Sequence, residues 1–92
     1  MYNYFMLIGR VNAIYSNGSI ELSVKNDFKD SNGTYGEQYI KVVPDDFMVD
    51  IVKKQLKFGK VIGVKGRITS TGSGFSSSSN LTLHAVKIMF LD

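Results

Sequence analysis

The residues of this sequence that could bind a ligand are lysines, arginines and aromatic residues at regular spacings. Four cations alternate with apolar residues along expected strands: Lys25, Lys41, Lys65 and Arg67. Tyr39 occupies the same kind of outward position, and Phe28 and Phe75 stand among polar residues. Cations can neutralise phosphates and ring faces can stack on bases, so this combination is typical of surfaces that bind single-stranded nucleic acid.

Catalytic and metal-binding patterns are missing from the sequence. There is no Cys, and the single His84 has no second ligand with which to form a metal site. We therefore expect His84 to have a structural role or to lie on the surface. Asp45 and Asp46 are explained by the electrostatics of a helix start. The chain also lacks a Walker-type phosphate loop and a nucleophile beside a base. We therefore expect a binding protein, not an enzyme, without metal or cofactor.

Composition is that of one soluble domain covering residues 1–92, with 43% hydrophobic residues, a net charge of +3 and a pI near 9.2. The mild basic excess is compatible with a polyanionic partner. The apolar run from Tyr4 to Ile8 is too short for a membrane span, and no signal peptide is recognisable. A cytoplasmic protein that does not associate with membranes is expected.

The strands and the helix that carry these side chains can be predicted from hydrophobic periodicity. We expect strands at 5–11, 19–25, 37–43, 60–68 and 81–91, the last with a bulge near Ala85, and one helix at 45–58. Pro44 should close the third strand. This order matches the OB-fold, an all-β, five-stranded Greek-key barrel with one α-helix between strands 3 and 4, which binds oligonucleotides or sugars.

Several residues allow two interpretations within this architecture. Phe28 and Phe75 should lie in the loops after the second and fourth strands, at 26–36 and 70–80, where each alone could be ordinary packing but both together favour ligand contact. Arg10, which closes the first strand, could contact phosphate or a subunit interface. The lysines of the helix are expected to form a solvated face: Lys53, Lys54 and Lys57.

Four segments together resemble, in order and spacing, the bacterial single-stranded DNA-binding protein (SSB) family. They are Phe5-Met-Leu-Ile-Gly-Arg-Val11, Tyr39-Ile-Lys-Val-Val43, Leu56-Lys-Phe-Gly-Lys-Val-Ile-Gly-Val-Lys-Gly-Arg67 and Ile88-Met-Phe-Leu-Asp92. The resemblance implies binding of single-stranded DNA without sequence specificity in replication, recombination or repair. It also implies a homotetramer or homodimer paired through the first strand, and base stacking on Phe28, Tyr39 and the region of Phe75.

The sequence departs from the family pattern in three places. It has no Trp, so stacking per base should be weaker. The family's aromatic residue after the third strand has no direct counterpart, and Phe47 is expected to be core instead. No acidic tail follows Asp92, so either the tail has been truncated or the chain is a tail-less relative, such as the primosomal protein N type or a phage or mobile-element form, which should recruit other proteins poorly. The alternative function is an OB-fold subunit of a primosome or replisome whose main ligand is another protein.

Overall fold

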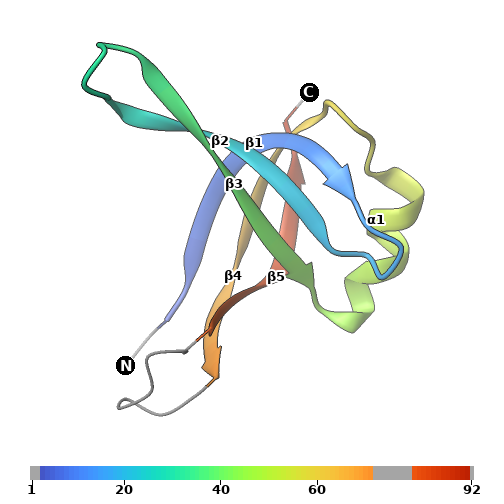
Figure 1. Ribbon diagram of the computed structural model, residues 1–92. Helices are drawn as coiled ribbons and strands as arrows, with labels where there is room; N and C mark the ends of the chain where they lie inside the picture. Colours follow the sequence, from blue (N-terminus) through green and yellow to red (C-terminus); the bar gives the residue numbers. More distant parts are fainter. Residues whose placement is uncertain (1–2, 72–79, 92) are drawn as a thin grey trace.

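The structure, a computed structural model, describes residues 3–71 and 80–91, so Phe75 lies outside the described residues. This part of the chain folds into the expected order of elements (Figure 1). They are β1 (Phe5–Ile14), β2 (Ile20–Lys29), β3 (Tyr35–Pro44), a 3₁₀ turn (Asp46–Met48), α1 (Val49–Gln55), β4 (Val61–Thr71) and β5 (Asn80–Phe90).

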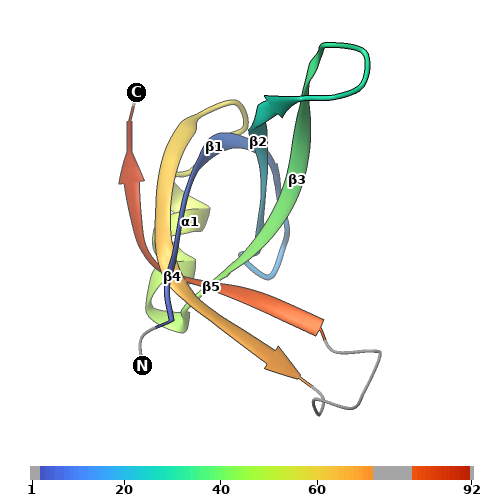
Figure 2. The same ribbon diagram turned by 90° about the vertical axis from the view of Figure 1, so that its left-hand side faces the viewer.

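The strands close into a barrel in the order β1-β2-β3-β5-β4, which confirms the predicted OB-fold (Figure 2). β1 pairs antiparallel with both β2 and β4, and β4 with β5. The barrel closes where β3 meets β5 in parallel, through three Cα pairs: Val42–Leu83, Val43–His84 and Pro44–Ala85. Pro44 ends β3, as predicted, because it has no N–H to donate to a continuing ladder.

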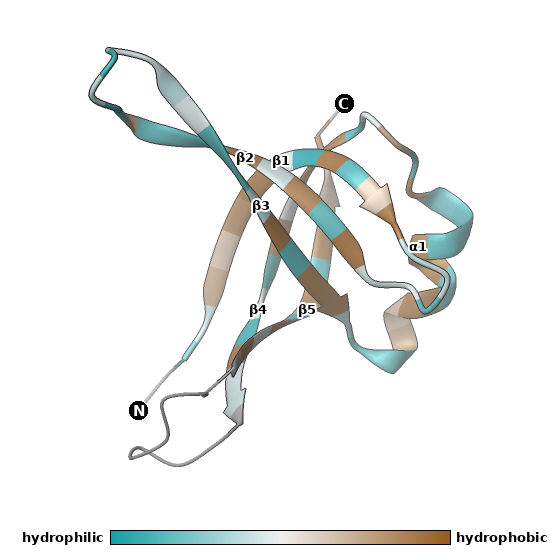
Figure 3. Ribbon diagram, viewed as in Figure 1, coloured by the Kyte–Doolittle hydropathy of each residue, from teal (hydrophilic) through white to brown (hydrophobic). Residues whose placement is uncertain are grey.

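The core is built by the period-two alternation that the sequence predicts. Ile20 and Leu22 on β2 are fully buried, and so is Val42 on β3. The alternating hydrophobic and polar bands along these strands are visible in Figure 3. Each fully buried aliphatic side chain contributes about 1.5–3 kcal/mol of transfer free energy, so this interior supplies the main driving force for folding.

β2 is longer than the alternation predicted, and this places Phe28 on a strand rather than in a loop. The strand runs to Lys29 because the turn that follows is tight. Asp30 Oδ1 accepts hydrogen bonds from the backbone N–H groups of Asn32 (2.9 Å) and Thr34 (3.0 Å), which compresses the expected loop into a few residues. The ends of β2 and β3 therefore project beyond the barrel as a hairpin arm, residues 26–36 (Figure 1).

The helical segment is shorter than predicted and begins as a 3₁₀ turn. Met48, Val52 and Leu56 are buried as expected, but Phe47 is 66% exposed, so the prediction that it belongs to the core was wrong. A 3₁₀ turn has three residues per turn, which shifts Phe47 out of phase with the buried face of α1. No helix within the described residues is long and apolar enough to span a membrane.

The predicted bulge in the last strand is present. Lys65 pairs with Lys87 whereas Gly66 pairs with Ala85, so Val86 is the extra residue on β5. At this bend the backbone carbonyl of His84 lies directly against Gly66, which is buried. Only a residue without a side chain fits there.

Candidate nucleic-acid interface

The candidate interface is the outer surface of β1, β2 and β3, opposite the buried alternation. Strand register brings its side chains together in rows: Ser23 pairs with both Arg10 and Tyr39, and the next outward pairs along β2 and β3 are Glu21–Lys41 and Lys25–Glu37. We call this surface the outer sheet face. Its members are Arg10, Glu21, Ser23, Lys25, Glu37, Tyr39 and Lys41.

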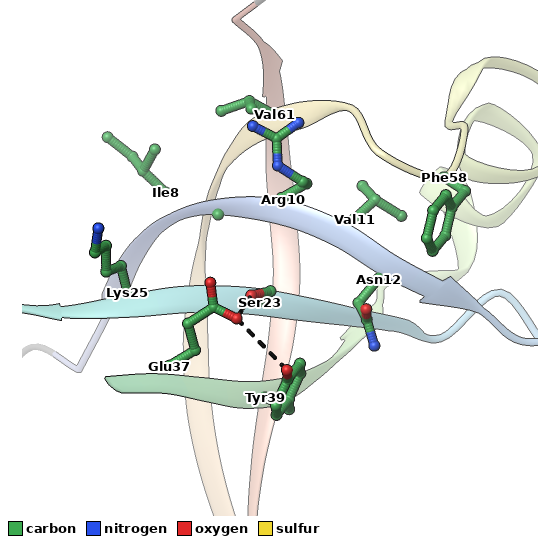
Figure 4. A pocket seen from close by; sticks show the side chains of 11 residues that line it. Ile8, Arg10, Val11, Asn12, Ser23, Lys25, Glu37, Tyr39, Phe58 and Val61 are labelled. Carbon is green, nitrogen blue, oxygen red and sulfur yellow. Dashed lines mark hydrogen bonds between the residues drawn. The ribbon is translucent and has the colours of Figure 1, made fainter. Parts of the chain in front are cut away.

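A groove of about 460 Å³ crosses this face and collects three of the predicted binding residues, Arg10, Lys25 and Tyr39. Two aromatic rings border it. Tyr39 is 60% exposed on β3, and Phe58, in the turn between α1 and β4, is 76% exposed. Figure 4 shows Glu37, Ser23 and Tyr39 close together at one side of the groove and Phe58 at the end nearest the helix. The dimensions and lining suit a flat ring with polar edges and a phosphate nearby.

Arg10 is held at the rim of the groove by a backbone contact. Its Nη1 donates a hydrogen bond of 2.7 Å to the carbonyl oxygen of Gly59, in the turn before β4. A guanidinium has five N–H donors, so several remain for an anion. The contact therefore positions Arg10 without using up its capacity to bind phosphate.

The hairpin arm carries a second group of rings and cations. The ammonium groups of Lys25 and Lys29 lie 5.9 Å and 5.6 Å from the centroid of the Tyr35 ring, within cation–π range. Phe28 is exposed on the same arm. Lys25 thus lines the groove and contacts a ring of the arm, so it links the two surfaces.

Lys41 lies at the other end of the face, beside Tyr15 and Glu21. Its ammonium is 5.4 Å from the centroid of the Tyr15 ring. Glu21 accepts hydrogen bonds at both oxygens, from Asn12 Nδ2 (2.7 Å) and from the Tyr15 hydroxyl (3.2 Å). The bond to Glu21 and its negative charge raise the pKa of the Tyr15 phenol, so Tyr15 remains a neutral donor.

Glu37 is the acidic residue of the groove. Its Oε2 accepts a hydrogen bond from Ser23 Oγ (3.0 Å) and lies 3.5 Å from the Tyr39 hydroxyl. Within the described residues Oε1 has no hydrogen-bond partner, and the single ion pair is the one between Arg67 and Asp45. Glu37 is therefore a fixed carboxylate with one oxygen available to a ligand.

Lys65 and Arg67 are exposed but do not share the outer sheet face with Tyr39, contrary to the expectation. Lys65 is paired with Met6 on β1 and Lys87 on β5. Arg67 makes a bidentate ion pair with Asp45 (2.9 and 3.1 Å), in a separate hollow lined by Phe47. Alternation distinguishes residues that point into a barrel from those that point outward. It does not show which side of the barrel they lie on: β1 separates β4 from β2, so the outward residues of β4 face a different direction from those of β2 and β3.

His84 is half-buried and its Nε2 lies 2.9 Å from Thr69 Oγ1, which agrees with a structural role. Among the described residues, no group of three or more His, Asp or Glu side chains could hold a metal ion.

Sequence reasoning overlooked Glu37 and Phe58. Glu37 lies two positions before Tyr39 on the same strand, so its outward position could be read from the sequence, but the search was for cations and rings. Phe58 precedes Gly59, whose φ of +88° turns the chain between α1 and β4, and connecting turns of this kind lie at the surface.

Comparison with known proteins identifies the form of the barrel. No protein-family model matches the sequence, and no curated protein does. Among solved structures, the chain is similar to the Plasmodium falciparum SSB in complex with single-stranded DNA, with 21% identity, a TM-score of 0.73, and coverage of 100% of this chain and 96% of that one.

Two further structures give the same result. The small single-stranded DNA-binding protein of Streptomyces coelicolor is 19% identical, with a TM-score of 0.67 and coverage of 98% and 95%. Rim1, a mitochondrial single-stranded DNA-binding protein of S. cerevisiae, is 10% identical, with a TM-score of 0.69 and coverage of 99% and 94%. The class defined here is the OB-fold. More particularly, the chain has the fold of these single-stranded DNA-binding proteins over almost its whole length.

Proposed function

We propose that this protein binds single-stranded DNA without strict sequence specificity, in DNA replication, recombination or repair, and has no catalytic activity. The observation that carries the proposal is the groove on the outer sheet face, which is lined by the exposed ring of Tyr39 and by the cations Arg10 and Lys25. A base stacked on Tyr39 would leave its phosphates near these cations. Phe28 and Lys41 extend the track in the two directions along β2 and β3, and Phe75, Lys65 and Arg67 stay candidate contacts.

The structural neighbours support this function over a protein ligand. One of them is a complex with single-stranded DNA, and the others are named for the same ligand. An OB-fold subunit whose main partner is another protein is therefore the less favoured alternative.

The test is a fluorescence anisotropy titration with oligo-dT and with a duplex of the same length. We expect at least tenfold tighter binding to the single strand, because only unpaired bases can stack on Tyr39. Affinity for oligo-dT should fall steeply with added salt, with a slope of about −0.7 in log K against log salt for each phosphate neutralised. Equal affinity for duplex, or affinity that salt does not change, would rule out this proposal in favour of the protein-ligand alternative.

We also propose that two or four copies associate through β1. The outward residues in the first half of this strand, and Tyr4 just before it, are apolar: Tyr4, Met6 and Ile8 are all exposed in the isolated chain. Their surroundings contain the aliphatic stems of Lys65 and Lys87, which can cover apolar surface while their ammonium groups remain in water. A contiguous apolar strand of this kind is typical of a subunit interface.

Replacing Met6 with Glu should convert the oligomer to monomer, because the new carboxylate would be buried between two copies at a cost of several kcal/mol. Multi-angle light scattering measures the change. Ile51→Glu is the matched control, since Ile51 is an exposed apolar residue on α1, which lies near the far end of β1 from Met6 (Figure 1). A monomeric wild-type protein, or equal dissociation by both variants, would contradict the interface.

A further inference from the structure

Glu37 is an unexpected residue on a surface that should attract phosphates. Its charge lies in the groove beside Tyr39, and no described cation forms an ion pair with it. Lys25, its partner across the strands, points its ammonium toward the Tyr35 ring of the hairpin arm. A carboxylate here weakens binding of the DNA backbone, so a compensating contact with some other part of the ligand is the simplest reason for its position.

The carboxylate is fixed in place rather than free to swing away. Ser23 Oγ and the Tyr39 hydroxyl both approach its Oε2, at 3.0 and 3.5 Å, which leaves Oε1 without a hydrogen-bond partner among the described residues. Outward side chains two residues apart on a strand are separated by about 6.6 Å, close to the width of a base. A base stacked on Tyr39 would therefore present an edge to Glu37.

The chemistry of this contact distinguishes among bases. A carboxylate only accepts hydrogen bonds, and the donors on unpaired bases are the exocyclic amino groups of cytosine, adenine and guanine and the ring N–H groups of guanine and thymine. Thymine has no amino group, and its single ring N–H, at N3, lies between two carbonyl oxygens that repel a carboxylate. The position of Glu37 is thus favourable for amino bases and unfavourable for thymine.

We propose that Glu37 biases binding toward single strands whose bases carry an exocyclic amino group, by accepting a hydrogen bond from the base stacked on Tyr39. This inference rests on the proposed function and adds a base preference to it. The bias is modest, because one contact per bound strand segment distinguishes bases while phosphate contacts and stacking act on all of them alike.

Glu21 provides an internal control on the same face. It carries the same charge and lies two strand positions beyond Ser23, but both of its oxygens are occupied, by Asn12 and Tyr15. Removing Glu21 deletes a negative charge without deleting a free acceptor. A comparison of the two glutamates therefore separates charge from base recognition.

The experiment measures dissociation constants for oligo-dC and oligo-dT of equal length at pH 8 and fixed salt, in wild type, Glu37→Ala, Glu37→Gln and Glu21→Ala. Both alanine variants should bind oligo-dT more tightly than wild type, since each loses a negative charge. The ratio of affinity for dC over dT should fall by about threefold to tenfold in Glu37→Ala. It should fall at least as far in Glu37→Gln, whose amide N–H can donate to thymine oxygens, and stay within about twofold in Glu21→Ala.

The ratio compares each variant with wild type, so intrinsic differences in flexibility between the two oligonucleotides cancel. An unchanged ratio in Glu37→Ala, or equal shifts in the Glu37 and Glu21 variants, would overturn the base preference while tight oligo-dT binding left the proposed function standing. If wild-type protein bound neither oligonucleotide, both proposals would fail together.

Discussion

Replacing Tyr39 with Ala should weaken oligo-dT binding by about 5-fold to 150-fold, the equivalent of roughly 1–3 kcal/mol for one stacked base. The thermal midpoint Tm should hardly change, because the ring is 60% exposed on the outer sheet face and its loss leaves no cavity in the core. Anisotropy titration and thermal unfolding of the same preparation measure the two quantities.

Two variants make the Tyr39 result specific. Tyr39→Phe keeps the ring and loses only the hydroxyl contact with Glu37, so it should retain most of the affinity. Phe47→Ala removes a ring that is equally exposed but lies in the hollow beside Arg67, away from the groove, and should have little effect. If Phe47→Ala weakened binding as much as Tyr39→Ala, the ligand would not be confined to the outer sheet face.

Gly66→Ala should destabilise the fold by about 3 kcal/mol or more, the upper range for overpacking a well-packed interior. A Cβ at this position would overlap the carbonyl oxygen of His84 and come within 3.0 Å of Phe5 Cε1. The carbonyl belongs to the bulged backbone of β5, so relief would require separating β4 from β5. Urea denaturation followed by circular dichroism measures the loss as a lower midpoint.

Gly36→Ala is the matched control for Gly66. It lies on the hairpin arm, where an added Cβ would meet only the side-chain amide of Asn26 at 3.3 Å, and that group can shift. We expect less than about 1 kcal/mol from this variant. Wild-type stability in Gly66→Ala would show that the β4–β5 bend can open without cost, and would contradict the packing described here.

The fold was largely predictable because its elements follow from local periodicity. The alternation at Ile20, Leu22 and Val42 marks buried faces of strands wherever they lie in space, and the bulge near Ala85 appears as a change of phase. Strand ends were less predictable. β2 continues past Phe28 because Asp30 organises a tight turn, and the contacts of one side chain are not encoded in hydrophobic periodicity.

The site was only partly predictable for a geometric reason. Periodicity separates inward from outward residues, but a closed barrel has outward surfaces on every side. Periodicity alone therefore could not show that Lys41 lies near Tyr39 while Arg67 lies beside Asp45. That distinction depends on strand order. The outward position of Glu37 could be predicted from the sequence, but the search was for positive charges and Glu37 is negative.

The parallel seam between β3 and β5 has a mechanical consequence. It joins the barrel through three Cα pairs, one of which includes Pro44, a residue without an N–H donor. The antiparallel pairings of β2 with β1 and with β3 are longer, although each contains one register shift. Arg10, Ser23 and Tyr39 all lie in these antiparallel pairings and none beyond the seam. If the barrel opens at one place, we expect it to open at this parallel pairing, which would leave the proposed binding groove intact on β1, β2 and β3.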